Sequence, residues 1–295
     1  MVIMPERDPD GLSVRAADGA GSRAAHSPPQ GQWEVTIATY GRRLTDRRHV
    51  FLNHDLYGEA DGPIGMDYFV WVVRDGLTTV LVDTGFSAQG GAARGRQQLV
   101  GIRDLYDRLE VDPAGSPTVV VTHAHYDHIG NLGLFPSSPV IIAQRELAFW
   151  RSPMRDKPLF SHSHDPEAFA QLERAVVDDR VVLFDTEHQL APGISVLEVG
   201  GHTPGQSMVV VDTSAGRVLL TSDAVHYYEE LEREMPFSSV VDVGGMYAGF
   251  ARIKELQSSG VVQHVVSGHD PQTLTRCLPG LEPGQMIGTI GGGNS

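Results

Sequence analysis

The sequence predicts a layered α/β fold, and three observations support this prediction. The chain has 295 residues, of which 41% are hydrophobic and 20% are charged, so it can bury a substantial core without disulfides. Segments with the alternating polarity of strands are interspersed with segments whose apolar residues recur at helical spacing. Several polar side chains also follow strand-like segments directly, as they do where the loops of a layered α/β fold build a site.

The start of the chain differs in composition from the rest. Residues 1–31 are rich in glycine, alanine, proline and aspartate and hold almost no large apolar residues. We therefore expect a disordered tail over residues 1–31 and a single domain over residues 32–295.

The first half of this domain is expected to consist mainly of strands. Residues 33–40 alternate in polarity, and residues 67–73 and 79–82 are β-branched or aromatic runs. Asp75-Gly76 between these two runs is typical of a hairpin turn. Residues 97–109 place large apolar side chains close to one helical face, so a helix is expected there before a strand at 118–121.

The second half continues the alternation of the two patterns. Apolar residues at helical spacing predict helices over residues 144–150, 166–177 and 243–257. Short β-branched runs predict strands at residues 140–142, 181–184, 195–199, 208–211, 218–220 and 261–266.

Five polar residues stand where these strands end. They are Asp83, His123, His202, Asp223 and His269. Loops at one edge of stacked sheets converge on a common crevice. Five such residues from five different strands therefore predict one shared site.

The stretch VVVTHAHYDHIGN crowds further metal-binding residues into the turn after one strand. In an extended chain, His123 and His125 project to the same side and can bind one ion. Asp127 and His128 follow after the chain has turned and would face a neighbouring position. With His202, Asp223 and His269 the set has seven nitrogen and oxygen ligands, which exceeds one tetrahedral site and suits two ions. Two such ions can activate a water and polarise a carbonyl, so a site that holds them is suited to hydrolysis.

These residues resemble the metallo-β-lactamase superfamily, whose HxHxDH motif matches residues 123–128. The later elements GHTPG (201–205), SDA (222–224) and GHD (268–270) come in the order of that family, and Asp83 matches an acidic residue after an early strand. The resemblance covers roughly residues 32–275. It implies an αββα sandwich, in which two mixed β-sheets pack face to face and helices flank them.

The resemblance also implies a ligand assignment. One ion would take His123, His125 and His202, and the other would take Asp127, His128 and His269, with Asp223 as the bridge. Asp83 would orient a ligand histidine from behind. We expect two divalent ions, with zinc preferred and iron, manganese or cobalt as alternatives.

Within the superfamily, the sequence is most similar to the branch of N-acyl homoserine lactonases. This similarity implies that a metal-bridging hydroxide opens a lactone or cleaves a carboxylic ester. Where that branch has a tyrosine three residues after the bridging aspartate, this chain has His226. We expect Asp127 or His226 to manage the proton of the leaving alkoxide, beside the bridging Asp223; a solvent-facing loop histidine is the alternative for His226.

Six further residues are candidates for the substrate pocket. Tyr126 lies inside the HxHxDH motif, and Tyr227 and Tyr228 follow His226. The early stretch HDLYGEADGPIGM resembles a loop that reaches over the pocket in the lactonases. It contributes His54, Tyr57 and Met66, for which hairpin-loop and core packing is the alternative. A second HxH pair, His162 and His164, lacks the following Asp-His and is expected at most to touch the substrate or cap the pocket.

Two rival functions remain from the sequence. A glyoxalase-II-like thioester hydrolase would use the same seven ligands, although only 26 residues follow His269 here. A non-catalytic metal-binding scaffold is the other alternative. We expect a small-molecule ester or lactone as the partner, and a homodimer stays open.

Charge and composition exclude other classes of partner. The net charge of −14 repels phosphate backbones, which argues against nucleic acid. No apolar run is long enough to span a membrane, and the start lacks the pattern of a secretory signal, so a cytoplasmic location is expected. Cys277 is the single cysteine and cannot form a disulfide within the chain.

Overall fold

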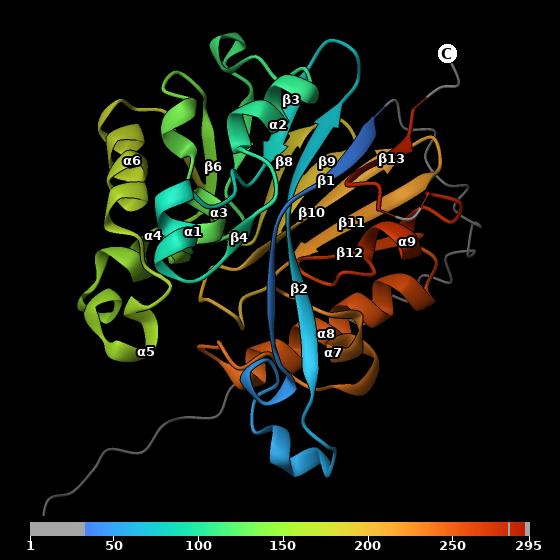
Figure 1. The fold of residues 1–295 in the computed structure, drawn as a ribbon. Helices are drawn as coiled ribbons and strands as arrows, with labels where there is room; N and C mark the ends of the chain where they lie inside the picture. Colours follow the sequence, from blue (N-terminus) through green and yellow to red (C-terminus); the bar gives the residue numbers. More distant parts are fainter. Residues whose placement is uncertain (1–32, 283, 293–295) are drawn as a thin grey trace, which may run out of the picture.

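In the computed structural model, two β-sheets stack between two layers of helices (Figure 1). The structure describes residues 33–282 and 284–292. The predicted tail over residues 1–31 lies outside the described residues. The expected αββα sandwich with two mixed sheets is confirmed.

The larger sheet is antiparallel on one side and parallel on the other. Its strands run in the order β13-β1-β2-β3-β5-β6-β7, with β4 on β1. The pairs from β13 to β3 are antiparallel, and those from β3 to β7 are parallel. The strand bounds are β1 Glu34–Asp46, β2 Pro63–Arg74, β3 Thr79–Val82, β4 Gln97–Gln98, β5 Thr118–Val120, β6 Val140–Ala143, β7 Val181–Phe184 and β13 Ile287–Gly291.

The smaller sheet has the order β12-β11-β10-β9-β8. Only the pair β11–β12 is parallel, so this sheet is mixed as well. The strand bounds are β8 Glu187–Ala191, β9 Ile194–Glu198, β10 Ser207–Thr213, β11 Gly216–Ser222 and β12 His264–Ser267.

Helices cover the outer face of each sheet. Helices α4 and α6 lie at one side of the stacked sheets and α8 at the other (Figure 1). Short 3-10 turns occur at residues 47–49, 54–57, 113–115, 132–134 and 153–156. The helix bounds are α1 Ala88–Ala93, α2 Ile102–Arg108, α3 Tyr126–Ile129, α4 Gln144–Arg151, α5 Pro158–Ser161, α6 Pro166–Val177, α7 Tyr228–Arg233, α8 Val243–Ser258 and α9 Thr273–Cys277. None of the described helices is long and apolar enough to cross a bilayer.

Alternation along the strands produces the four layers. In β3, Val80 and Val82 belong to the core between the sheets, whereas Leu81 belongs to the core under the helices of the first layer. In β11, Leu220 faces the inner core and Leu219 packs with α8. Successive side chains of a strand point to opposite faces, so sheets buried on both sides need these continuous apolar runs.

Local capping explains where the best-predicted helix begins. The Asp165 side chain accepts hydrogen bonds from the backbone of Glu167 and Ala168 at 3.0 and 3.1 Å. Pro166 follows as the first helical residue, where a missing N–H costs nothing. Helix α6 therefore has the bounds that the sequence predicts, residues 166–177.

Two expectations about the elements need correction. The helix expected over residues 97–109 begins only at Ile102, because Gly101 is extended and Gln97 and Gln98 pair with β1. The strands β8 and β13 were not predicted. They lie at sheet edges and carry polar or glycine-rich sequences, so pairing with a neighbour forms them rather than an apolar pattern.

Candidate metal centre

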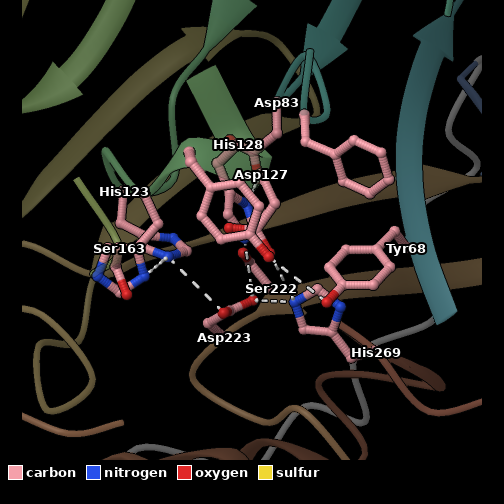
Figure 2. A network of polar contacts seen from close by, with 12 residues as sticks. Tyr68, Asp83, His123, Asp127, His128, Ser163, Ser222, Asp223 and His269 are labelled. Carbon is pink, nitrogen blue, oxygen red and sulfur yellow. Dashed lines mark hydrogen bonds and ion pairs between the residues drawn. The ribbon is translucent and has the colours of Figure 1, made fainter. Parts of the chain in front are cut away.

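The loops after five strands meet at one edge of the stacked sheets. Asp83 follows β3, His123 follows β5, His202 follows β9, Asp223 follows β11 and His269 follows β12. The structure brings all five together and buries each of them. Figure 2 shows Asp223 between histidines that come from different parts of the chain.

The first group of candidate ligands is His123, His125, His202 and Asp223. One atom from each lies within 4.8 Å of every other. His125 Nδ1 is 3.0 Å from both His123 Nε2 and His202 Nε2, and Asp223 Oδ2 is 3.4 Å from His202 Nε2. Burial lowers the pKa of His123 and His125, which favours the neutral imidazole that binds a metal.

The second group is Asp127, His128 and His269, again with ligand atoms within 4.8 Å of one another. His128 Nε2 is 3.9 Å from Asp127 Oδ1, and His269 Nε2 is 3.9 Å from Asp127 Oδ2. Both histidines also face the remaining oxygen of Asp223. The distances from Asp223 Oδ1 are 3.1 Å to His269 Nε2 and 3.4 Å to His128 Nε2.

The Asp223 carboxylate therefore lies between the two groups. Its Oδ2 faces the first group and its Oδ1 faces the second. Three buried atoms, Asp223 Oδ1, His128 Nε2 and His269 Nε2, have no hydrogen-bond partner within the described residues. Burying unsatisfied polar atoms costs free energy unless a ligand satisfies them. The donor set and these orphaned atoms fit two divalent cations that share one carboxylate.

Groups behind the histidines fix which nitrogen faces the centre. His269 Nδ1 lies 2.8 Å from the carbonyl oxygen of Asp67, and His202 Nδ1 lies 2.7 Å from that of Ser239. A carbonyl oxygen only accepts hydrogen bonds, so each Nδ1 carries the proton. Each Nε2 then presents a lone pair to the centre, as a ligand must.

Asp83 lies behind His128, which is one of the candidate ligands. Its Oδ2 is 2.7 Å from His128 Nδ1 and accepts a hydrogen bond of 2.7 Å from the Thr122 hydroxyl. Its Oδ1 accepts one of 2.8 Å from the Thr122 backbone N–H. Asp83 has a φ of 61°, in the left-handed region, which aspartate tolerates better than most residues. The Asp83 carboxylate thus connects Thr122, which lies between β5 and His123, to His128 of the second group.

Glu146 in α4 supports the first group, and no pattern in the sequence singles it out. It is fully buried, and its Oε1 accepts hydrogen bonds from Ala124 N at 2.9 Å and Trp150 Nε1 at 2.7 Å. Its Oε2 accepts one from Gly205 N at 3.0 Å. One carboxylate therefore ties the loop of His123 and His125 to the loop that carries His202. Only the three-dimensional packing could have revealed this role.

His226 lies against the bridging carboxylate. Its Nε2 is 3.0 Å from Asp223 Oδ2, its Nδ1 is 3.4 Å from Glu230 Oε1, and its ring stacks on Phe237 with centroids 3.7 Å apart. Burial alone would lower the pKa of the His226 imidazole, but the Asp223 and Glu230 carboxylates raise it to about 9. The alternative of a solvent-facing loop histidine is wrong, because His226 is fully buried.

A cleft of about 320 Å³ opens onto both groups. Of the predicted pocket residues, Tyr126 and Met66 line it, and so does His226. Sequence reasoning missed several other residues of its wall. These are Arg43, His49, Tyr68, Arg94, Arg96, Ser163, Phe237, Ser238 and Ser239. They come from loops and from β1 and β2, which no local motif connects.

The structure corrects the pocket role expected for Tyr227 and Tyr228. The Tyr227 hydroxyl donates to the carbonyl oxygen of Gly65 at 3.0 Å, and its ring belongs to the core. The Tyr228 hydroxyl donates to the carbonyl oxygen of Val265 at 2.9 Å and lies 3.4 Å from Cys277 Sγ. Both lie at the start of α7, which directs their side chains away from the cleft.

Two residues of the early loop also lie elsewhere. His54 is buried beside Phe51, with ring centroids 6.4 Å apart, and Tyr57 packs against the core. Neither lines the cleft, because the 3-10 turn that carries them sits beyond the hairpin end. His162 does line the cleft, whereas His164 stacks on Trp150 at 5.6 Å instead.

Comparison with known proteins identifies the class. Residues 65–258 match the family model described as the metallo-beta-lactamase superfamily, and the chain belongs to this superfamily. Among characterised relatives, the chain is 26% identical to an N-acyl homoserine lactonase of Bacillus sp over 156 residues, which are 52% of this chain and 56% of that protein. It is 30% identical to an N-acyl homoserine lactonase of Azorhizobium caulinodans over 170 residues, 55% of this chain and 61% of that protein. These matches span little more than half the length of the lactonases.

Solved structures show the same fold over a larger share of the chain. A structure described as a quorum-quenching N-acyl homoserine lactone lactonase superposes with a TM-score of 0.69 at 20% identity, covering 85% of this chain and 97% of that one. A dizinc quorum-quenching lactonase in complex with a product superposes with a TM-score of 0.64 at 19% identity, covering 90% and 97%. At this identity the likeness establishes the fold.

Proposed function

We propose that this protein is a dinuclear metal-dependent hydrolase that opens a lactone or cleaves a carboxylic ester. The observation that carries the proposal is the shared carboxylate of Asp223, which faces three histidines through one oxygen and the second ligand group through the other. Two divalent ions bound there, for which zinc is our first choice, would supply an activated water and polarise a carbonyl oxygen.

The side chains around the centre have separate tasks in this proposal. His123, His125 and His202 hold one ion, and Asp127, His128 and His269 hold the other. Opening a lactone breaks the ring C–O bond, and the leaving alkoxide takes up a proton. His226 borders the cleft next to Asp223 and supplies that proton, while Asp127 offers a second carboxylate at the same wall.

The relatives support the choice of a lactone. The matched relatives in several Bacillus species and in Azorhizobium caulinodans are N-acyl homoserine lactonases. Thioester hydrolysis of the glyoxalase-II type and metal binding without catalysis use the same ligands and are the alternatives to be tested. A cytoplasmic location, a single domain over residues 32–295 and a homodimer stay predictions.

The test is a metal count combined with a substrate panel. Purified zinc-loaded protein should bind two ions per chain and hydrolyse lactones faster than aryl esters or glutathione thioesters. Two bound ions without turnover of any ester would support the scaffold, and a preference for glutathione thioesters would support the glyoxalase-II type. The variant Asp223→Asn should lose activity, whereas Asp107→Asn, an exposed carboxylate of α2, serves as the matched control.

A further inference from the structure

Three arginines line the same cleft as the candidate metal ligands. They are Arg43 of β1 and Arg94 and Arg96, which follow α1. We call these three residues the arginine cluster. Each is partly buried, so the cluster belongs to the wall of the cleft rather than to the open surface.

The arginine cluster has no carboxylate partner within the described residues. Neighbouring arginines do have one: Arg42 pairs with Asp67 at 2.7 Å and Arg47 with Glu229 at 2.7 Å. Among the described residues, Asp127 and Asp223 are the only carboxylates that line the cleft, and both belong to the ligand groups. The chain has a net charge of −14, yet none of these three guanidinium groups forms an ion pair with a described residue; Asp127 acts on Arg96 only as a nearby charge.

Backbone contacts hold Arg94 in place. Its side chain donates to the carbonyl oxygens of His162, Gly90 and His164 at 2.9, 3.0 and 2.8 Å. Its guanidinium also lies over the ring of Tyr126, 4.1 Å from the ring centroid. A guanidinium fixed in this way loses little conformational entropy when it binds a ligand.

Arg96 is also fixed, but with donors to spare. Its Nε donates to the Tyr126 hydroxyl at 2.9 Å, and its Nη1 donates to the carbonyl oxygen of Arg94 at 2.6 Å. Its Nη2 makes no hydrogen bond to the described residues. Among the described residues, the Arg43 side chain donates one hydrogen bond, from Nη2 to the Thr45 hydroxyl at 3.1 Å. The cluster therefore keeps N–H groups that donate to no described residue and can donate to an oxyanion.

We infer that the substrate carries an oxyanion, a carboxylate or a phosphate, on the part remote from the scissile carbonyl, and that the arginine cluster binds it. The inference rests on the proposed ester or lactone hydrolysis and adds a substrate class to it. A neutral N-acyl homoserine lactone would leave the cluster unpaired. The anion would also be drawn into the cleft against the repulsion of the acidic surface.

The first experiment compares matched substrates. A γ-butyrolactone with a carboxymethyl group, its primary amide and its phosphonate-bearing analogue share one ring and differ in charge. With the zinc-loaded protein, kcat/KM should be roughly 10- to 100-fold higher for an anionic lactone than for the amide, as expected for hydrogen bonds to a charged group. The ratio between the carboxylate and phosphonate lactones identifies the oxyanion. Equal rates for the amide and both anions would overturn the inference.

Variants test whether the arginine cluster causes the preference for the anionic lactone. Arg96→Met should remove most of the preference for the anion and raise KM for the anionic lactone far more than for the amide. Arg43→Met serves as the second variant, because the Arg43 side chain makes one hydrogen bond among the described residues, so a folding defect is less of a concern. Arg103→Met, an exposed arginine of α2 outside the cleft, should keep the wild-type preference. A preference that survives in both cleft variants would refute the role of the cluster.

A binding measurement separates this inference from the proposed hydrolysis. Calorimetry with the zinc-loaded protein compares glutarate with glutaramate, which lacks the second charge. Tighter binding of glutarate that Arg96→Met abolishes would support the oxyanion site even if no ester were turned over. Equal binding of the two ligands would overturn it even if neutral lactones were good substrates.

Discussion

Replacing Glu146 by glutamine should loosen the first ligand group while leaving the second in place. The carboxylate accepts hydrogen bonds from Ala124 N, Trp150 Nε1 and Gly205 N, and it is fully buried. Both carboxylate oxygens accept hydrogen bonds from these three donors, although burial raises the pKa of the Glu146 carboxyl. A glutamine keeps the size of the side chain but turns one of the two acceptors into a donor.

The expected loss of stability of the Glu146→Gln variant follows from this mismatch. If the amide oxygen keeps the contacts of Oε1 with Ala124 and Trp150, the new NH2 group faces Gly205 N across 3.0 Å. One buried N–H then has no acceptor, at a cost of about 1–3 kcal/mol. For a chain of this size that corresponds to a Tm lower by roughly 2–10 °C. Affinity for the ion of the first group should fall about 10- to 100-fold, as for other groups that orient metal ligands.

The assay combines thermal unfolding with metal analysis. Zinc-loaded Glu146→Gln protein is dialysed against increasing chelator, and the metal remaining per chain is measured by mass spectrometry. The first ion should leave at a lower chelator concentration than in the wild type. Glu173→Gln, which removes a half-buried carboxylate paired with Arg151 outside the candidate metal centre, is the control. A lowered Tm with wild-type affinity for both ions would refute the idea that Glu146 holds the two ligand loops together.

Three further predictions follow from the same geometry. Asp83→Asn keeps a residue that tolerates the φ of 61° but weakens the contact with His128, so chelator should remove an ion about 10- to 100-fold more readily; unchanged retention would contradict this. Asp223→Asn should lower bound metal below two per chain and kcat at least about 100-fold, because both ions lose a direct ligand, and full activity would remove the dinuclear mechanism. His226→Gln should keep both ions but lower kcat about 10²- to 10⁴-fold for alkyl esters and much less for nitrophenyl esters, whose leaving group needs no proton; an equal loss for both would show that His226 does not donate the proton.

The pattern of the sequence located most of the strands and helices, whereas the αββα arrangement was expected from the resemblance to the superfamily. β-Branched and aromatic runs located β3 and β7 at their observed bounds, and apolar residues at helical spacing located α6. These elements form where the local pattern and the packing favour the same structure. The strands β8 and β13 escaped prediction, because their sequences are weakly apolar and they form by pairing at a sheet edge.

The pocket shows the limit of the same reasoning. Tyr227 and Tyr228 stand next to His226 in the sequence, yet α7 turns their side chains into the core, and only His226 reaches the cleft. The side chains of adjacent residues in a loop point in different directions. Proximity to a motif in the sequence therefore predicted poorly which side chains line the cleft. Arg94 and Arg96 lie outside the matched motifs and reach the cleft through the fold.

The sequence by itself determined the class of fold and the seven candidate ligands, because ligand chemistry needs particular residue types at fixed spacing after strand ends. The tertiary structure decided what surrounds them. It placed Glu146 beneath the loops of the first group. It also gathered three arginines without carboxylate partners among the described residues on the wall of the cleft. Such contacts join side chains distant in sequence, and only the packing of the sheets brings them within reach of one another.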